Sequence, residues 1–127
     1  MPEAKFYFNK CCNSHVEHFA GEAKDISCCG EPMKALTANT TDASQEKHVP
    51  VIEINGNLVT VKIGSIEHPM VPEHHIEWLY LECTKGIQRK PLAVDGQPQA
   101  TFALTEGDKA VRAYAYCNLH GLWTADV

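Results

Sequence analysis

Residues 49–63 read VPVIEINGNLVTVKI, and this stretch decides the class of fold. Its first half is rich in β-branched residues, which favour strands. In its second half, residues 58–63, apolar and polar side chains alternate, so that Val59, Val61 and Ile63 share one face. An Asn-Gly pair at positions 55–56 joins the halves, and this pair is the strongest short signal of a hairpin. The stretch therefore predicts two antiparallel strands.

Further short strands are predicted after this hairpin, at residues 76–82, 100–104 and 111–116. Loop residues separate them, including two prolines between positions 64 and 73 and a Thr-Lys-Gly turn at 84–86. No helical pattern of useful length is present. Short strands at this spacing predict a mainly β chain that folds as an antiparallel β-sandwich.

The composition excludes several classes of function. The chain has 127 residues, of which 44% are hydrophobic and 21% charged, and this is ordinary for a globular protein. Its formal net charge of -5 argues against binding to nucleic acid or to an anionic lipid surface. No apolar run is long enough to span a membrane, and the first residues lack the apolar core of a signal peptide. We therefore expect a cytoplasmic protein without a membrane partner.

Six cysteines and seven histidines are unusual in so short a chain. In a reducing cytoplasm they indicate metal binding or redox chemistry rather than disulfides. Four of the cysteines form two adjacent pairs, at 11–12 and 28–29, in a segment too short to bury a large core. We predict a small domain at residues 1–36 and a β-sandwich domain at 37–127, joined through the polar segment 36–47.

The other candidate ligands fall at the ends of predicted strands, where a sandwich gathers its loops. They are His48, His68, His74, His75, Cys117 and His120. The two-residue gap between Cys117 and His120, at the end of the last predicted strand, is a metal-ligand spacing. His74 and His75 are adjacent and point to opposite sides, so at most one faces the same site as His68. Cys83 stands apart and is predicted to be a small buried hydrophobe.

Four imidazoles and one thiolate suit iron or copper better than structural zinc, which closes at four ligands. A thiolate opposite an open position would make the ion electron-rich. Two alternatives are a blue-copper electron carrier and a structural zinc module. The first normally has a methionine soon after the final histidine, whereas Gly121, Leu122 and Trp123 follow His120 here.

Four motifs, in order along the chain, resemble the superoxide reductase family of desulfoferrodoxins and neelaredoxins. They are EKHVPVIE (46–53), GSIEHPM (64–70), HHIEW (74–78) and YCNLHGLW (116–123). The resemblance implies a mononuclear non-haem iron, cycling between Fe2+ and Fe3+, on an immunoglobulin-like β-sandwich. It implies equatorial ligands at His48, His68, His74 and His120 and an axial thiolate at Cys117. His75 falls where the family usually has an aromatic residue, and it stays outside this set.

The implied reaction is the one-electron reduction of superoxide to hydrogen peroxide with uptake of two protons. Glu46 matches the glutamate that closes the open iron position in the ferric state, and Lys47 matches a lysine beside that position. A positive charge there would draw in an anionic substrate. From the residues alone this pair reads as a solvated linker pair. The resemblance also implies rubredoxin or a similar small protein as electron donor, a homodimer, and a role in defence against oxidative stress. A superoxide dismutase is the nearest enzymatic alternative.

The N-terminal segment CCGEPM (28–33) resembles the end of a desulforedoxin domain, a rubredoxin-like unit in which four cysteines hold a second iron. The match places Cys12 at the second ligand position and Asn9 at the first. This departure predicts a degenerate metal site in a domain that keeps its shape by packing. A site of all four cysteines and a site that uses Cys12 and His15 remain alternatives.

Overall fold

The computed structural model describes residues 5–22 and 26–127. The chain divides into two compact units, Met1–Thr37 and Ala38–Val127. The predicted mainly β fold is confirmed in both.

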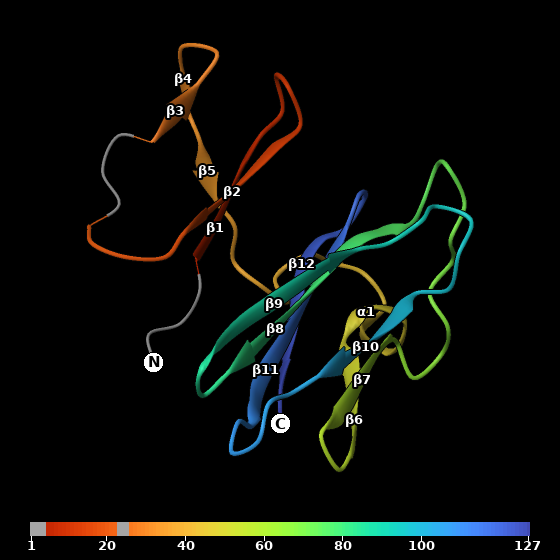
Figure 1. The fold of residues 1–127 in the computed structure, drawn as a ribbon. Helices are drawn as coiled ribbons and strands as arrows, with labels where there is room; N and C mark the ends of the chain where they lie inside the picture. Colours follow the sequence, from red (N-terminus) through yellow and green to blue (C-terminus); the bar gives the residue numbers. More distant parts are fainter. Residues whose placement is uncertain (1–4, 23–25) are drawn as a thin grey trace. The chain divides into compact units, whose positions relative to one another are not determined.

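Two antiparallel sheets build the Ala38–Val127 unit (Figure 1). The first, in the order β10-β7-β6, consists of β6 (Pro50–Asn55), β7 (Leu58–Ile63) and β10 (Gln99–Ala103). The second, in the order β12-β11-β8-β9, consists of β8 (Ile76–Cys83), β9 (Gly86–Pro91), β11 (Ala110–Cys117) and β12 (Gly121–Asp126).

The core of this unit is one cluster of apolar side chains contributed by both sheets. From the first sheet come Val59, Val61, Ile63 and Phe102, and from the second Leu79, Leu81, Ala113 and Ala115. Burying one large aliphatic side chain contributes about 1.5–3 kcal/mol. The alternation in residues 58–63 therefore identified the buried face of β7 correctly.

The predicted hairpin at 49–63 is confirmed. Asn55 pairs with Leu58, so Gly56 and Asn57 form a two-residue turn between β6 and β7. Gly56 has a φ of 61°, in the left-handed region that this kind of turn requires.

The structure corrects the predictions at three places. Residues 86–91 form β9, an edge strand whose less exposed face carries Gly86, Gln88 and Lys90 and so shows no apolar alternation. Residues 121–126 form β12, so Cys117 and His120 do not end the last strand but bound the loop of the β11–β12 hairpin. Residues 45–48 form a single helical turn, α1 (Gln45–His48), within the segment predicted as part of a linker.

The described residues of the Met1–Thr37 unit form five short strands. One sheet has the order β2-β1-β5, with β1 (Lys5–Asn9), β2 (Ser14–His18) and β5 (Lys34–Ala35). The other pairs β3 (Ser27–Cys28) with β4 (Glu31–Pro32). Among its described residues only Phe6, Asn9 and Met33 are buried, so this unit has a very small core.

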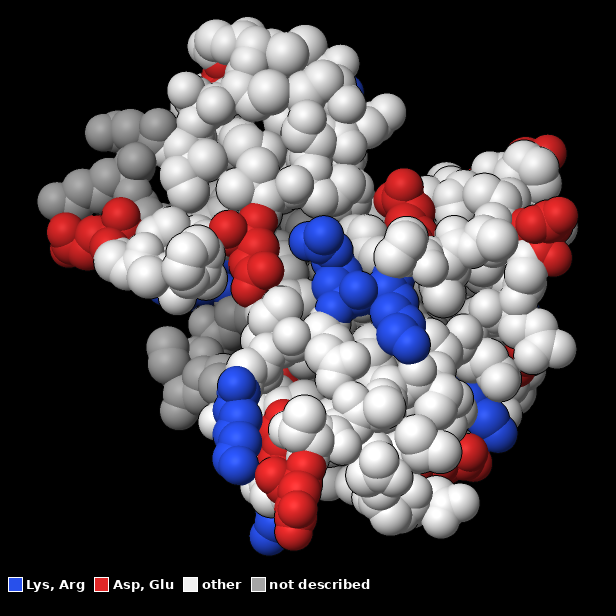
Figure 2. Space-filling model, in the orientation of Figure 1, with Lys and Arg blue, Asp and Glu red and all other residues white. Residues whose placement is uncertain are grey.

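No helix within residues 5–22 and 26–127 combines the length and apolar character needed to cross a bilayer. On the face drawn in Figure 2, the described basic and acidic side chains are interspersed, singly or in small groups. Charge of neither sign therefore covers that face continuously.

Candidate metal centre

Strand register in the four-stranded sheet brings two chain segments together. Cys117, at the end of β11, lies opposite both Ile76, at the start of β8, and Gly121, at the start of β12. His74 lies two residues before the start of β8, and His120 lies in the β11–β12 loop. Both histidines therefore flank Cys117.

The three-stranded sheet supplies the other two segments. Pro50 pairs with Ile63, so the residues before β6 and after β7 lie at the same end of the hairpin. The chain before β6 forms α1 and carries His48. The chain after β7 turns back on itself and carries His68. A hydrogen bond of 3.2 Å from the His68 N–H to the Ile63 carbonyl holds this turn.

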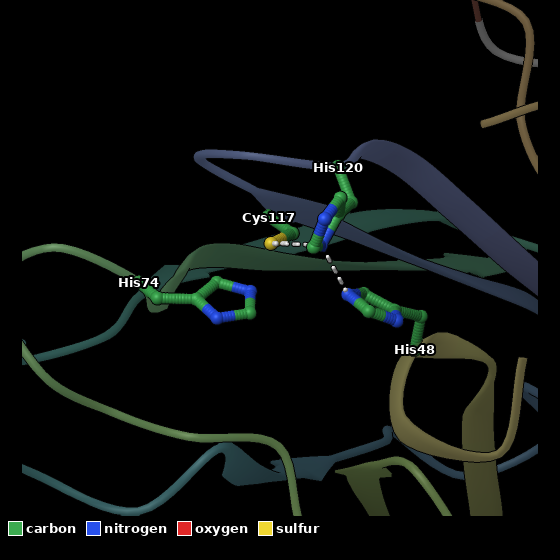
Figure 3. Close-up of side chains that lie close together, drawn as sticks. All are labelled: His48, His74, Cys117 and His120. Atoms are coloured by element: carbon green, nitrogen blue, oxygen red, sulfur yellow. Dashed lines mark hydrogen bonds between the residues drawn. The ribbon is translucent and has the colours of Figure 1, made fainter. Parts of the chain in front are cut away.

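Four imidazoles from these segments form a closed ring, which we call the histidine ring: His48, His68, His74 and His120. In that order, neighbouring ring centroids are 4.7, 4.6, 5.0 and 4.9 Å apart and their planes are nearly perpendicular. The opposite pair His48 and His74 is 6.1 Å apart. Figure 3 shows His74 and His48 facing each other from opposite sides, with Cys117 and His120 beside them.

The Cys117 sulfur lies against the histidine ring. Its Sγ is 3.4 Å from His68 Nε2 and 3.9 Å from His120 Nδ1. One candidate ligand atom from each of His48, His74, Cys117 and His120 lies within 4.8 Å of all the others in that set. His68 does not belong to that set, although it is a member of the histidine ring.

Hydrogen bonds fix the tautomers of two ring members. His48 Nδ1 is 2.6 Å from the Ser44 carbonyl, and His68 Nδ1 is 2.7 Å from the Pro69 carbonyl. A carbonyl only accepts, so each Nδ1 carries the proton and each Nε2 presents a lone pair. Those two Nε2 atoms are 3.2 Å apart. Two lone pairs at this distance repel each other unless a cation lies between them.

Burial keeps these imidazoles neutral. It lowers the pKa of His68 to about 4, and it is also the main cause that lowers the pKa of His48 and of His74. His74 Nε2 is buried and has no hydrogen-bond partner among the described residues. An unpartnered buried nitrogen beside two opposed lone pairs is what a metal ion would satisfy.

The spacing of the donor atoms also fits an ion. Nitrogen ligands about 2.1 Å from a metal and at right angles to one another are about 3 Å apart. His48 Nε2 is 3.2 Å from His68 Nε2 and 3.1 Å from His120 Nδ1. The residues present therefore fit a mononuclear ion with nitrogen and sulfur ligands.

Two opposing effects act on the pKa of the Cys117 thiol. Burial raises the pKa of Cys117, and hydrogen bonds from the backbone N–H groups of Leu119 and His120 oppose that rise. These two N–H groups stabilise negative charge on the sulfur, which is the form that binds a metal.

Glu46 and Lys47 lie on α1 with exposed side chains. Burial is the main cause that lowers the pKa of both His48 and His74, and the charge of Lys47 is the smallest of the causes that act on each. The Glu46 carbonyl accepts hydrogen bonds from the Ile66 N–H (3.0 Å) and the Ser65 hydroxyl (3.3 Å), which tie α1 to the loop after β7.

Gly64 allows this close approach. Its φ is +86°, and a Cβ there would lie 2.3 Å from the Ile66 carbonyl oxygen, 2.8 Å from the Glu46 carbonyl oxygen and 2.8 Å from the Lys47 carbonyl carbon. All three neighbours are backbone atoms and cannot swing away. A side chain at this position would therefore push α1 from the loop.

We expect Gly64→Ala to lower the free energy of unfolding by about 2–4 kcal/mol, through left-handed strain plus overlap with backbone. Gly56→Ala is the matched control, because Gly56 also has a positive φ but its Cβ would meet nothing within 4 Å. It should cost only about 1–2 kcal/mol. Urea titration followed by tryptophan fluorescence measures both. Equal losses in the two variants would contradict the close approach.

Two positioning residues had no clear signal in the sequence. Trp123 stacks on His48 with centroids 4.8 Å apart, and its indole N–H donates to the His120 carbonyl. Asn118 accepts a hydrogen bond from the His75 N–H and donates one to the Glu73 carbonyl, so it holds the segment that carries His74. These contacts join segments that are far apart along the chain, so they become visible only in the folded structure.

The other residues considered as metal ligands in the sequence lie outside the histidine ring. His75 turns its Nδ1 to the Val71 carbonyl, 3.0 Å away, outside the histidine ring. Cys83 is buried in the core, as predicted. In the other unit, Cys12, Cys28 and Cys29 lie close enough together to hold a metal, and neither Cys11 nor His15 belongs to that group of described residues. The His15 ring lies instead 5.1 Å from the ring of Phe8.

Comparison with known proteins adds an independent line of evidence. The sequence profile of the desulfoferrodoxin family matches residues 40–126. The chain is 45% identical to a desulfoferrodoxin of Clostridium acetobutylicum over 126 residues, or 98% of each chain. It is 36% identical to a superoxide reductase of Thermococcus kodakarensis, across 75% of this chain and 97% of that one.

A solved structure is similar along almost the whole chain. The superoxide reductase of Treponema pallidum superposes with a TM-score of 0.85 at 43% identity and covers 98% of this chain and 100% of its own.

Proposed function

The chain belongs to the desulfoferrodoxin family, and from this premise we propose that it is a superoxide reductase, which reduces superoxide to hydrogen peroxide. The observation that carries the proposal is the histidine ring with the Cys117 sulfur against it. A blue-copper site uses only two histidines and one cysteine, so it would leave two ring members unused.

We propose iron as the ion, with ligands His48, His68, His74, Cys117 and His120. When bound, the iron supplies the single electron that superoxide accepts. The chain's own part is to hold the four imidazoles in place and to keep negative charge on the Cys117 sulfur through the Leu119 and His120 N–H groups. The Ser44 and Pro69 carbonyls orient the rings of His48 and His68.

Lys47 is proposed to attract superoxide and to help deliver a proton to the reduced substrate, directly or through water. Its support is its exposed place on α1, directly before His48. Glu46 is proposed to close the open coordination position when no substrate is present. Its place on α1, two residues before His48, supports this role.

We expect Lys47→Ala to slow the bimolecular reaction with superoxide about fivefold at low salt and to flatten its dependence on ionic strength, because one attracting charge is lost. Stopped-flow measurements at several salt concentrations test this. Lys85→Ala is the matched control, since Lys85 lies in the turn after β8, at the end of that strand remote from His74. An unchanged rate and salt slope in Lys47→Ala would remove Lys47 from this role.

The decisive experiment combines two measurements on the purified protein. Elemental analysis should find iron bound by the Ala38–Val127 unit, lost in a His68→Ala variant. The protein should consume superoxide in proportion to added reductant and release no oxygen, whereas a dismutase would release oxygen without external electrons. Oxygen release without a reductant, or a colourless zinc protein, would reject the proposal.

The family resemblance extends the proposal to the protein's setting. We propose that a rubredoxin or similar small protein donates the electrons, that the chain works in the cytoplasm as a homodimer, and that residues 1–36 form a desulforedoxin-like domain. The short strands and very small core of the Met1–Thr37 unit support the last point.

A further inference from the structure

Three sulfur atoms converge in the Met1–Thr37 unit. The Sγ atoms of Cys12 and Cys28 are 3.1 Å apart, and those of Cys28 and Cys29 are 3.9 Å apart. Cys12 and Cys29 are exposed and Cys28 is half-buried. This cluster has no part in the function proposed above.

The fourth corner of a tetrahedral site is missing from this cluster. Asn9 stands where the first ligand would be, and its amide is already used: Nδ2 donates to the Cys28 carbonyl at 3.1 Å, and Oδ1 accepts from the Cys11 N–H at 2.7 Å. Cys11 is not in the converging group. Structural metal sites close at four ligands, whereas three thiols with one very short pair favour sulfur–sulfur chemistry.

We propose that Cys12 and Cys28 are a redox-active thiol pair that hydrogen peroxide oxidises to a disulfide. Cys12 is the attacking residue and Cys28 the resolving residue. The identity of the oxidant as the protein's own product rests on the proposed function, because superoxide reduction releases peroxide. Cysteines that sense oxidants are accessible to solvent and have a resolving thiol next to them, and this pair meets both conditions.

The surroundings of the pair assign the two roles. The Ser14 hydroxyl lies 2.9 Å from Cys12 Sγ. This hydrogen bond, followed by one from Cys28, lowers the pKa of Cys12 to about 7, whereas the same contact with Cys12 raises the pKa of Cys28. Cys12 therefore ionises more readily than Cys28, and the thiolate is the nucleophile.

The chemistry proceeds in two balanced steps. The Cys12 thiolate attacks one oxygen of hydrogen peroxide, the O–O bond breaks, hydroxide leaves, and Cys12 becomes a sulfenic acid. The Cys28 sulfur then attacks the Cys12 sulfur, the S–O bond breaks, and the Cys28 proton leaves with the oxygen as water. In total two thiols and one peroxide give one disulfide and two waters.

The test exposes the reduced, full-length protein to one equivalent of added hydrogen peroxide, so that it does not depend on superoxide turnover. Alkylation with N-ethylmaleimide and mass spectrometry of the digest then locate the remaining thiols. We expect loss of two alkylatable thiols, a peptide pair joined through Cys12 and Cys28, and full recovery with dithiothreitol. Cys28→Ser should stop at the first step and leave a sulfenic acid on Cys12 that dimedone labels.

Cys11→Ser is the matched control, because it removes a neighbouring thiol outside the converging group and should leave the bridge intact. The proposal is overturned if added peroxide produces no Cys12–Cys28 bridge while the same sample reduces superoxide normally, or if the bridge joins another pair. A metal ion that is lost in Cys12→Ser but kept in Cys117→Ser, and that shields these thiols from maleimide, would also overturn it. The parallel superoxide assay shows independently whether the proposed function holds.

Discussion

Cys117→Ser is expected to lower the rate of superoxide reduction by more than about a hundredfold and to remove the thiolate absorption of the oxidised protein. A serine hydroxyl has nearly the same size as the thiol, so the buried site should keep its shape. It does not ionise near neutral pH, however, so the N–H groups of Leu119 and His120 would face a neutral oxygen in place of negative charge. Stopped-flow kinetics, the visible spectrum and iron analysis measure the three consequences separately.

Cys83→Ser controls for the cost of placing a hydroxyl in the interior. Cys83 is also buried, but it lies at the far end of β8 from Ile76, which pairs with Cys117. We expect this variant to lose stability and to keep its rate. If Cys117→Ser retained the wild-type rate and spectrum, the sulfur would have no part in the reaction and the proposed ligand set would be wrong.

The sequence predicted those parts of the fold that repeat a pattern. Alternation in 58–63 and the Asn-Gly pair were enough to identify the β6–β7 hairpin and its buried face. β9 was missed because the less exposed face of this edge strand carries Gly86, Gln88 and Lys90 and therefore gives no apolar alternation. α1 was missed because four residues are too few for any helical period to appear.

For the site, the residue types predicted the kind of centre but not every ligand. Histidine and cysteine residues at the ends of predicted strands indicated a metal centre. The sequence alone did not show whether His74 or His75 is the ligand. The structure separates them: the His74 ring lies in the histidine ring, while His75 bonds to Val71 and is held at its backbone by Asn118. The carbonyls that orient His48 and His68 are backbone atoms, which no sequence pattern can reveal.

The metal-free protein is expected to lose stability as the pH falls from about 6.5 to 4. Burial lowers the pKa of His68 from an ordinary value of 6.5 to about 4, so in this window the unfolded chain binds a proton that the folded chain does not. Protons therefore favour unfolding, and the stabilisation is complete above pH 6.5 and lost by about pH 4. Each factor of ten in proton affinity is worth about 1.4 kcal/mol, so His68 alone should account for about 3 kcal/mol. His48 and His74 act in the same direction.

Urea titrations of the chelator-treated protein at a series of pH values test this, followed by the fluorescence of Trp78 and Trp123, which both lie in the Ala38–Val127 unit. His68→Gln should flatten the pH profile, because glutamine cannot take up the proton. His75→Gln, outside the histidine ring, should change the profile much less than His68→Gln does. Bound iron should displace the loss to lower pH, since metal and protons compete for the same Nε2 lone pairs. A flat profile in the metal-free wild type would mean that these imidazoles are not held neutral by burial, and the lone-pair argument for the metal centre would fail with it.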